Sequence, residues 1–220
     1  MDQITNVKNE INIYKNQFLG EYLLSLIDNP LYFSELLDDK DSRESYMLNL
    51  RAYVLLSHSE IESFLENIAK YYIDKSVEKF KSDGSINKIL YWFTLSSTNE
   101  INNKNTHNAE SKGYLSDPQD FIDLLVERYK STVNNNHGIK LKNLLSLFSP
   151  LGIGQPVLDS QLSILVDSIG TTRGIFAHHG SRDSMKKITS ITGPDEITQL
   201  IESIIANIKI EILDILEVML

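Results

Sequence analysis

Apolar residues recur every three to four positions along most of this chain, which is the period of an amphipathic α-helix. The first periodic stretch runs from Ile4 to Ile27 and is broken by Asn29-Pro30. A short helical piece is expected at Leu31–Leu37, and the acidic residues Asp38, Asp39 and Asp41 are read as a solvated turn. Ser42 is expected to cap the helix that follows.

The longest periodic stretch, from about Glu44 to Lys81, predicts the central packing element of the fold. Ser82-Asp83-Gly84 should end it. A shorter apolar helix is expected from Ile86 to Leu95, and it carries the single tryptophan, Trp92.

Residues 96–116 are rich in Ser, Thr, Asn and Lys without a period, which predicts a mobile surface loop. The remaining helices are expected at 117–134, 139–148, from an Asp159 cap to His178, and 194–220. The turn between Pro150 and Pro156 contains two glycines but follows no strand, so it is not a phosphate loop. The pattern therefore predicts an all-α fold, a helical bundle with a long central helix, in a single domain covering residues 1–220.

Composition removes several classes of function. The chain has no cysteine, which excludes disulfides, thiolate metal sites and cysteine proteases. No apolar run approaches the ~20 residues of a membrane span, so a cytoplasmic protein without a membrane partner is expected. The adjacent His178 and His179 point to different sides of a helix, so no metal site and no cofactor is predicted.

The net charge of −9 argues against broad coating of nucleic acid, because phosphate binding depends on clustered Lys and Arg. Any contact with RNA must be local. One basic group, Arg182, Lys186 and Lys187, follows the His178 segment and is the candidate RNA-binding patch. A second small group is Lys140 and Lys142.

The candidate chemistry lies at Arg173 and His178, which are separated by four residues. A histidine can exchange protons near neutral pH, and an arginine fork can hold the charge that develops on phosphate oxygens. Five residues rotate an ideal helix by about 140°, so the two side chains diverge unless a second chain completes the site. This predicts a dimer. Arg173 also follows Ile169 on the apolar stripe, so it is expected to be buried against a partner or at an interface.

Two structural interpretations stay open beside this one. Arg173 and His178 could serve the helix end alone, where cations interact favourably with the dipole and Gly180 could form the cap. Arg51 and His58 form a second Arg/His pair, but they lie two turns apart, about 10 Å along the axis. They are interpreted as partly exposed residues of the long helix.

The segment RGIFAHHG resembles the signature of the HEPN superfamily, an arginine and a histidine four to six residues apart in an Arg-Asn-x-x-Ala-His-Gly-like string. Arg173, Ala177 and His178 match this string. Gly174 replaces the usual polar residue, and His179 intervenes before the glycine. The long-helix segment LLSHSEIESFLENIAKYYID is similar to the early helix of stand-alone HEPN ribonucleases of the RiboL-PSP-HEPN kind, with Glu62 as the acid that precedes an aromatic residue.

The resemblance implies a helical bundle that dimerises so that two motifs face one another, with metal-independent endoribonuclease activity on RNA. It implies a toxin–antitoxin, phage-defence or RNA-processing setting, with an antitoxin or defence-system protein as a partner. On this reading His178 is the acid and base, Arg173 holds the phosphate, and Glu62 and His179 support them.

Two alternatives remain. The chain could be a non-catalytic interaction module or an inactive HEPN partner subunit. It could also be a target whose tyrosine is modified with nucleotides, but no tyrosine follows Tyr129.

Overall fold

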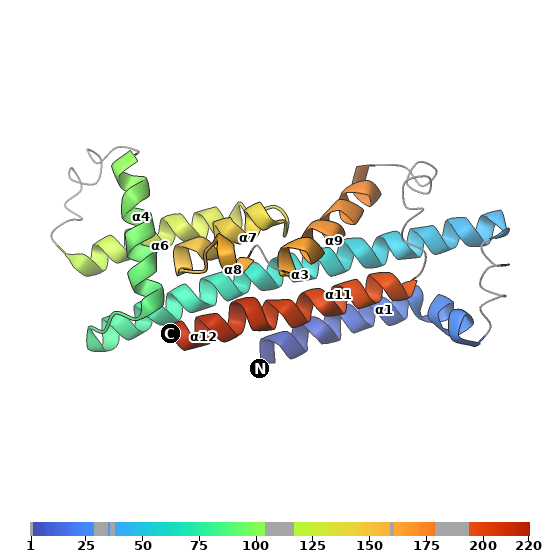
Figure 1. The fold of residues 1–220 in the computed structure, drawn as a ribbon, viewed down its shortest axis with the longest axis horizontal. Coiled ribbons are helices and arrows are strands. Elements are labelled where there is room, and N and C mark those ends of the chain that lie inside the picture. Colours follow the sequence, from blue (N-terminus) through green and yellow to red (C-terminus); the bar gives the residue numbers. More distant parts are fainter. Residues whose placement is uncertain (1, 29–34, 36–37, 104–116, 159–160, 179–193) are drawn as a thin grey trace. The chain divides into compact units, whose positions relative to one another are not determined.

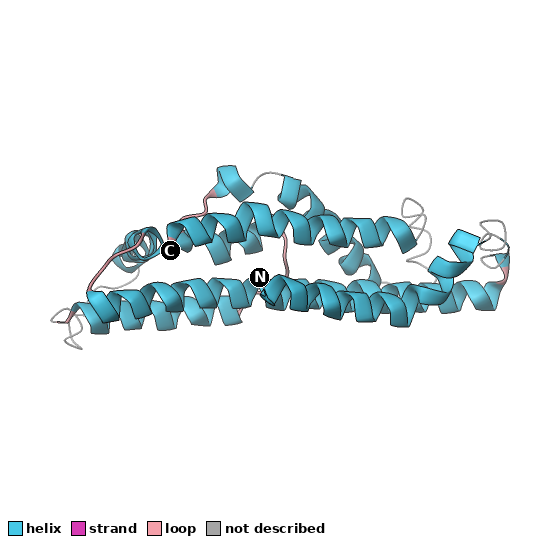
Figure 2. Cartoon of the chain, turned by 90° about the horizontal axis from the view of Figure 1, so that it is seen from below, coloured by secondary structure: helices cyan, strands magenta, loops and turns pink. Residues whose placement is uncertain are grey.

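The computed structural model describes residues 2–28, 35, 38–103, 117–158, 161–178 and 194–220 (Figure 1). Within these ranges every regular element is a helix and no strand is present (Figure 2). This confirms the all-α fold class. Among the described helices, none combines the length and the apolar character needed to cross a membrane.

The helices are, in chain order, α1 (Asp2–Asp28), α3 (Lys40–Asp83), α4 (Lys88–Asn103), α6 (Pro118–Asn134), α7 (Leu141–Phe148), the 3₁₀ turn η1 (Ser149–Leu151), α8 (Gln155–Leu158), α9 (Gln161–His178), α11 (Pro194–Ile208), the π-helical segment η2 (Lys209–Leu213) and α12 (Asp214–Met219). The long helix expected from Glu44 to Lys81 is thus present as α3, four residues longer at its N-terminus.

The chain divides into two compact units. The first comprises Met1–Phe64, Gly138–Lys140 and Gln161–Ile208, and the second comprises Leu65–His137, Leu141–Ser160 and Lys209–Leu220. The division falls within α3 and between α11 and η2. Each unit buries a core of its own.

In the first unit α1 and α9 both pack against α11 (Figure 1). The side chains that form this core are aliphatic or aromatic and fully or almost fully buried, and burial of such surface is the main driving force of folding. They include Val7, Ile11 and Leu19 of α1, Tyr53, Val54 and Ile61 of α3, Val166 and Ile169 of α9, and Ile197, Ile201 and Ile204 of α11.

In the second unit α4 packs against η1, α6 and α12, and α7 packs against α6 and α8. The rings of Phe93 and Tyr129 meet edge to face with centroids 5.5 Å apart. The buried hydroxyl of Tyr129 donates a hydrogen bond to the carbonyl of Leu147. A buried hydroxyl is normally hydrogen-bonded, and here the bond connects α6 to α7.

The start of α3 corrects the expectation for Ser42. The helix begins at Lys40, and the cap is Asp39, whose carboxylate accepts a hydrogen bond from the Ser42 backbone N–H at 2.9 Å. Hydrogen bonds from Ser42 hold the pKa of the Asp39 carboxyl below its usual range. The acidic turn is exposed as expected, but one of its members has a defined role, since Asp accepts from the free N–H groups of a first turn.

The loop expected at 96–116 is wrong at its beginning, because α4 continues to Asn103. Polar side chains of α4 donate hydrogen bonds to carbonyls of the same helix: Thr94 Oγ1 to Leu90, and Ser96 Oγ to Phe93. The buried turn around Leu90 and Phe93 starts the helix, and propagation through polar residues is cheap once it has started. Residues 104–116 lie outside the described part.

Four further expectations concern the 150–156 turn, the last helix, the piece at Leu31–Leu37 and the Asp159 cap. The turn between Pro150 and Pro156 contains a short helix, α8, beginning at Gln155. The last helix is interrupted by the π-helical segment η2. The expected piece at Leu31–Leu37, apart from Glu35, and the expected Asp159 cap lie outside the described residues.

Candidate functional site

Arg173 lies five residues before the end of α9, beside the buried side of that helix. Thr172 and Phe176 are buried, whereas Arg173 and Ala177 are exposed. The expectation that Arg173 is buried is therefore not met within the chain, because the buried side of the last turns is formed by Thr172 and Phe176. Burial of Arg173 at an interface with a second chain stays a prediction.

The other residues of the expected centre are described less fully. His178 is the last residue of α9, and its side chain is outside the described part. The supporting residue His179 and the basic patch Arg182, Lys186 and Lys187 also lie outside it. How the His178 imidazole and this patch lie relative to Arg173 therefore stays a prediction.

His58 of α3 lies within electrostatic range of Arg173. Burial lowers the pKa of His58, and the positive charge of Arg173 lowers it further, to about 4. His58 is only 4% exposed, so the interpretation of this histidine as partly exposed is wrong. Arg51, its partner in sequence spacing, is half-buried. At neutral pH His58 is an uncharged imidazole beside an exposed guanidinium.

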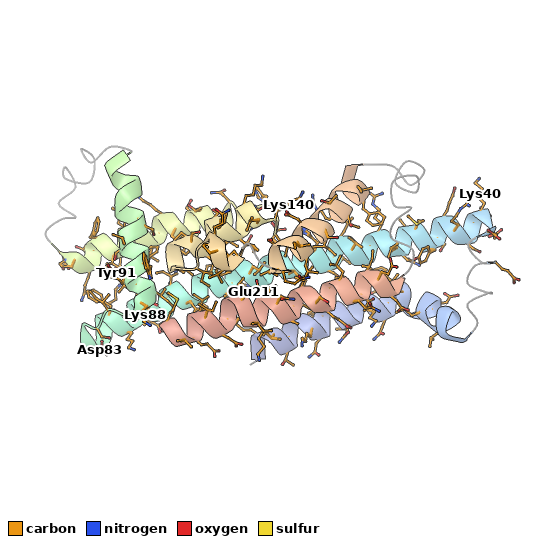
Figure 3. The ribbon with its side chains drawn as sticks, in the orientation of Figure 1. Lys40, Asp83, Lys88, Tyr91, Lys140 and Glu211 are labelled. Carbon is orange, nitrogen blue, oxygen red and sulfur yellow. The ribbon has the colours of Figure 1, made fainter. Side chains whose placement is uncertain are left out.

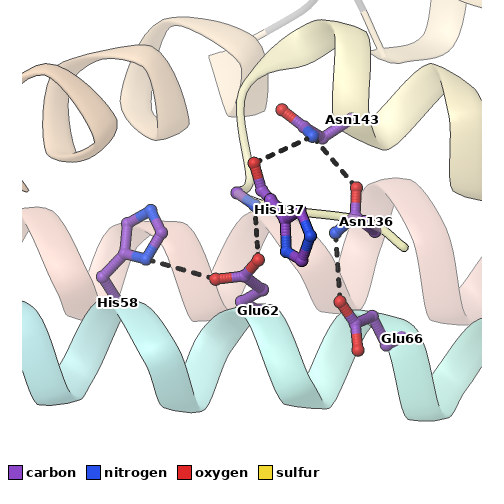
Figure 4. Close-up of polar contacts among 7 residues, drawn as sticks. His58, Glu62, Glu66, Asn136, His137 and Asn143 are labelled. Carbon is purple, nitrogen blue, oxygen red and sulfur yellow. Dashed lines mark hydrogen bonds and ion pairs between the residues drawn. The ribbon is translucent and has the colours of Figure 1, made fainter. Parts of the chain in front are cut away.

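Glu62 lies one turn after His58 on the same helix, and its two carboxylate oxygens have different partners (Figure 4). Oε2 lies 3.7 Å from Nδ1 of His58. Because the imidazole is neutral at pH 7, this is a polar contact and not an ion pair. Oε1 accepts a hydrogen bond from the backbone N–H of Gly138. Glu62 therefore links α3 to the segment Gly138–Lys140.

Lys140 in that segment lies against α9 (Figure 3). A Cβ atom built on Gly170 would be 3.2 Å from both Cγ and Cε of Lys140, so the absence of a side chain at Gly170 makes room for the lysine stem. Lys140 itself is exposed. Gly170 is buried and lies one turn before Arg173, so α9 accommodates one basic side chain and carries another.

The arrangement can hold an anion. Arg173 is exposed, and among the described residues it has no ion pair or hydrogen bond that would neutralise or occupy its guanidinium. The described part of the chain also contains no group of three or more His, Asp or Glu side chains that could hold a metal ion. An exposed arginine fork can bind a phosphate or a carboxylate through two parallel hydrogen bonds.

Sequence reasoning missed His58 as a neighbour of Arg173, and it had one signal that could have drawn attention to it. His58 and Glu62 are spaced i,i+4 on a continuous helix, which places them on the same face. Spacing along α3 could not reveal that α9 places Arg173 beside that face. Only the packing of distant segments shows it.

A comparison with protein families supports the resemblance to the HEPN superfamily. The family model described as RiboL-PSP-HEPN matches residues 6–214. No curated protein matches the chain. No solved structure matches it either. The family match covers α1 to the beginning of α12, including Glu62, Arg173 and His178. Because it spans nearly the whole sequence of this all-α chain, the chain belongs to the RiboL-PSP-HEPN family of the HEPN superfamily.

Proposed function

We propose that this chain is a metal-independent endoribonuclease whose centre is formed by Arg173 and His178. The observation that carries the proposal is the state of Arg173, which is exposed and without an ion pair among the described residues, in a chain of a HEPN family. An arginine with a structural role is normally paired or packed. A guanidinium left open to solvent is available to a phosphate.

The reaction that fits these groups is transfer within the RNA strand. His178 takes the proton of a ribose 2′-hydroxyl, and the 2′-oxygen attacks the adjacent phosphorus. The bond from phosphorus to the 5′-oxygen breaks, and that oxygen receives a proton from a histidine acting as the acid. Arg173 stabilises the charge on the non-bridging oxygens during attack. The products are a 2′,3′-cyclic phosphate and a 5′-hydroxyl, and no water or metal takes part in this step.

A second copy of the chain is part of the proposal. Arg173 and His178 are five residues apart on α9, so their side chains diverge by about 140° on an ideal helix. Two chains whose α9 ends face one another would place the arginine of one opposite the histidine of the other. The exposed Arg173 and Ala177 lie on the side of α9 that this arrangement would cover.

Glu62 and His58 serve as positioning residues in this proposal. Glu62 fixes the Gly138–Lys140 segment, and His58 stays neutral at pH 7, so it does not repel the guanidinium of Arg173. We assign the biological setting to toxin–antitoxin, phage-defence or RNA-processing systems, in which an antitoxin or defence protein would control the activity.

The test is RNA cleavage in EDTA by the purified chain and by His178→Ala and Arg173→Ala, with analysis of the ends produced. Removal of one group that stabilises charge in the transition state typically lowers the rate by about 10²–10³-fold. We expect both variants to lose cleavage and the wild type to leave 2′,3′-cyclic phosphate ends. Arg51→Ala, which removes the arginine of the second Arg/His pair, is the matched control and should retain activity.

Equal inactivity of all four proteins on a broad panel of RNAs would overturn the proposal. The non-catalytic interaction module would then be the better interpretation, which the net charge of −9 also favours. Cleavage that survives in both His178→Ala and Arg173→Ala would show a contaminating or differently placed nuclease.

A further inference from the structure

Two adjoining cavities in the second unit lie between α6 and α7. One has a volume of about 400 Å³ and the other of about 430 Å³. Thr132 of α6 and Ser146 of α7 line both, so the two cavities adjoin, and together they are called here the α6–α7 groove. Each volume falls in the range of about 300–1,000 Å³ that is usual for ligand sites.

The walls of the α6–α7 groove favour an anion. Arg128 lines the first cavity and Lys142 the second, with hydroxyl groups of Ser96, Ser97 and Ser149 around the first. None of the described residues that line either cavity is Asp or Glu. This is informative because the chain has 30 acidic residues against 21 Lys and Arg.

Of the charged residues of α6, Arg128 lines the groove, whereas Asp123 and Glu127 do not. Asp123 precedes Thr132 by nine residues and Glu127 precedes it by five, which places them about 180° and 140° away around the helix. Asp123 is moreover paired with Lys81 at 2.7 Å. Asp123 therefore lies on the far side of α6 from Thr132, and Glu127, one turn before Ser131, lines neither cavity.

Hydrogen bonds fix the amide side chains of the second cavity (Figure 4). Nδ2 of Asn143 donates to Oδ1 of Asn136 at 3.0 Å and to the His137 carbonyl at 3.3 Å. Nδ2 of Asn136 donates in turn to Glu66, which does not line the groove. Nδ2 of Asn135 donates to the Ser131 carbonyl at 2.8 Å. A wall that is already ordered loses less entropy when a ligand binds.

We propose that the α6–α7 groove binds the sugar–phosphate backbone of a single-stranded RNA segment outside the cleavage centre. Arg128 and Lys142 would each hold a phosphate, one in each cavity, and the hydroxyl and amide groups between them would bind sugar or phosphate oxygens. Two adjoining cavities with one cation in each suit successive phosphates of a strand. The inference rests on the proposed function only in taking RNA as the ligand.

Binding of a labelled single-stranded RNA, measured by fluorescence anisotropy, tests the groove separately from cleavage when every protein carries His178→Ala. Arg128→Gln with Lys142→Gln should lower the affinity by about tenfold. It should also reduce the slope of log affinity against log salt by about 1.4, since each contact with a single strand contributes about 0.7. Lys88→Gln with Lys209→Gln removes two exposed charges of the same unit outside the groove and should leave both nearly unchanged.

A second pair of variants guards against a general effect of charge. Thr132→Glu places a carboxylate between the two cavities and should weaken binding strongly. Gln119→Glu adds the same charge to an exposed position of α6, about 140° around the helix from Thr132. It should bind RNA like the parent protein. Circular dichroism of all variants checks that the helices are retained.

Crosslinking with 4-thiouridine RNA, followed by peptide mapping, gives the position directly, and we expect adducts within α6 and α7. The inference is overturned if the groove variants bind like their controls, if adducts form only elsewhere, or if a mononucleotide competes as well as the strand. If binding follows these expectations but the wild-type protein cuts no RNA, the groove proposal stands and the proposed nuclease activity is rejected.

Discussion

The positive charge of Arg173 on α9 lowers the pKa of the buried imidazole of His58 on α3. Burial is the larger cause and the arginine the second, and together they bring the pKa to about 4. Two segments more than a hundred residues apart in sequence thus share one electrostatic environment. The residue that tunes the histidine is also the proposed phosphate-binding group.

His58 should make the stability of the protein depend on acidity. An unfolded histidine takes up a proton near pH 6.5, whereas folded His58 does so only near pH 4. The unfolded state therefore binds more protons between these values, and stability falls as the pH is lowered from about 6.5 to about 4. By pH 4 this difference in pKa lowers the free energy of unfolding by roughly 3 kcal/mol.

Urea unfolding across this pH range measures the effect. His58→Asn should flatten the acid limb, even if the variant is less stable at neutral pH. His137→Gln removes an exposed histidine and should keep the limb of the parent protein. An unchanged acid limb in His58→Asn would contradict the assignment of the lowered pKa to this histidine.

Glu62 should matter chiefly as a hydrogen-bond acceptor for Gly138. Glu62→Ala removes the carboxylate that accepts a hydrogen bond from the Gly138 N–H and should cost about 1–3 kcal/mol in the free energy of unfolding. Glu62→Gln keeps an oxygen at the same position and should lose less. Ser63→Ala, at the exposed neighbouring position of α3, should change stability by less than about 0.5 kcal/mol. Equal losses in Glu62→Gln and Glu62→Ala would show that the charge, and not the acceptor, is needed.

Gly174 of the Arg173–His178 segment stands in open space, since nothing lies within 4 Å of a Cβ atom added there. Glycine in a helix is less favourable than alanine by about 0.8–1.0 kcal/mol. Gly174→Ala should therefore stabilise the protein by up to about 1 kcal/mol and raise its melting temperature. Gly170→Ala should gain less, because its Cβ atom would have to displace the stem of Lys140. A loss of stability in Gly174→Ala that grows with protein concentration would mean that a second chain covers this position.

Gly152 is required for two reasons, and its replacement should be costly. Its φ of +96° is rarely adopted by other residues, and an added Cβ atom would lie 2.7 Å from both Met219 Cε and Trp92 Cδ1. Gly152→Ala should destabilise the protein by about 2–4 kcal/mol, as the sum of backbone strain and overpacking. Gly154→Ala is the control, because its nearest atom would be Pro156 Cδ at 3.6 Å. Thermal melts of the two variants should therefore differ clearly, and similar melts would contradict this account.

The periodic placement of apolar residues was enough to predict α1, α3, α6 and the helix that carries Arg173, because burial of one face requires that period. Proline and glycine marked ends correctly at Pro118 and Gly84. The pattern did not predict the helical continuation of α4 through polar residues or the π-helical segment η2. Neither feature alters the spacing of apolar residues, so the hydrophobic pattern does not reveal them.

The sequence by itself determined the fold class, the family resemblance and the candidate pair Arg173 and His178, because these depend on local spacing. Only the tertiary structure decided that Arg173 is exposed and that its charge lowers the pKa of His58. It also decided that Glu62 accepts a hydrogen bond from Gly138. These relationships join segments far apart in the chain. They arise from the way helices pack, and the packing direction of one helix against another is not encoded in the periodicity of either.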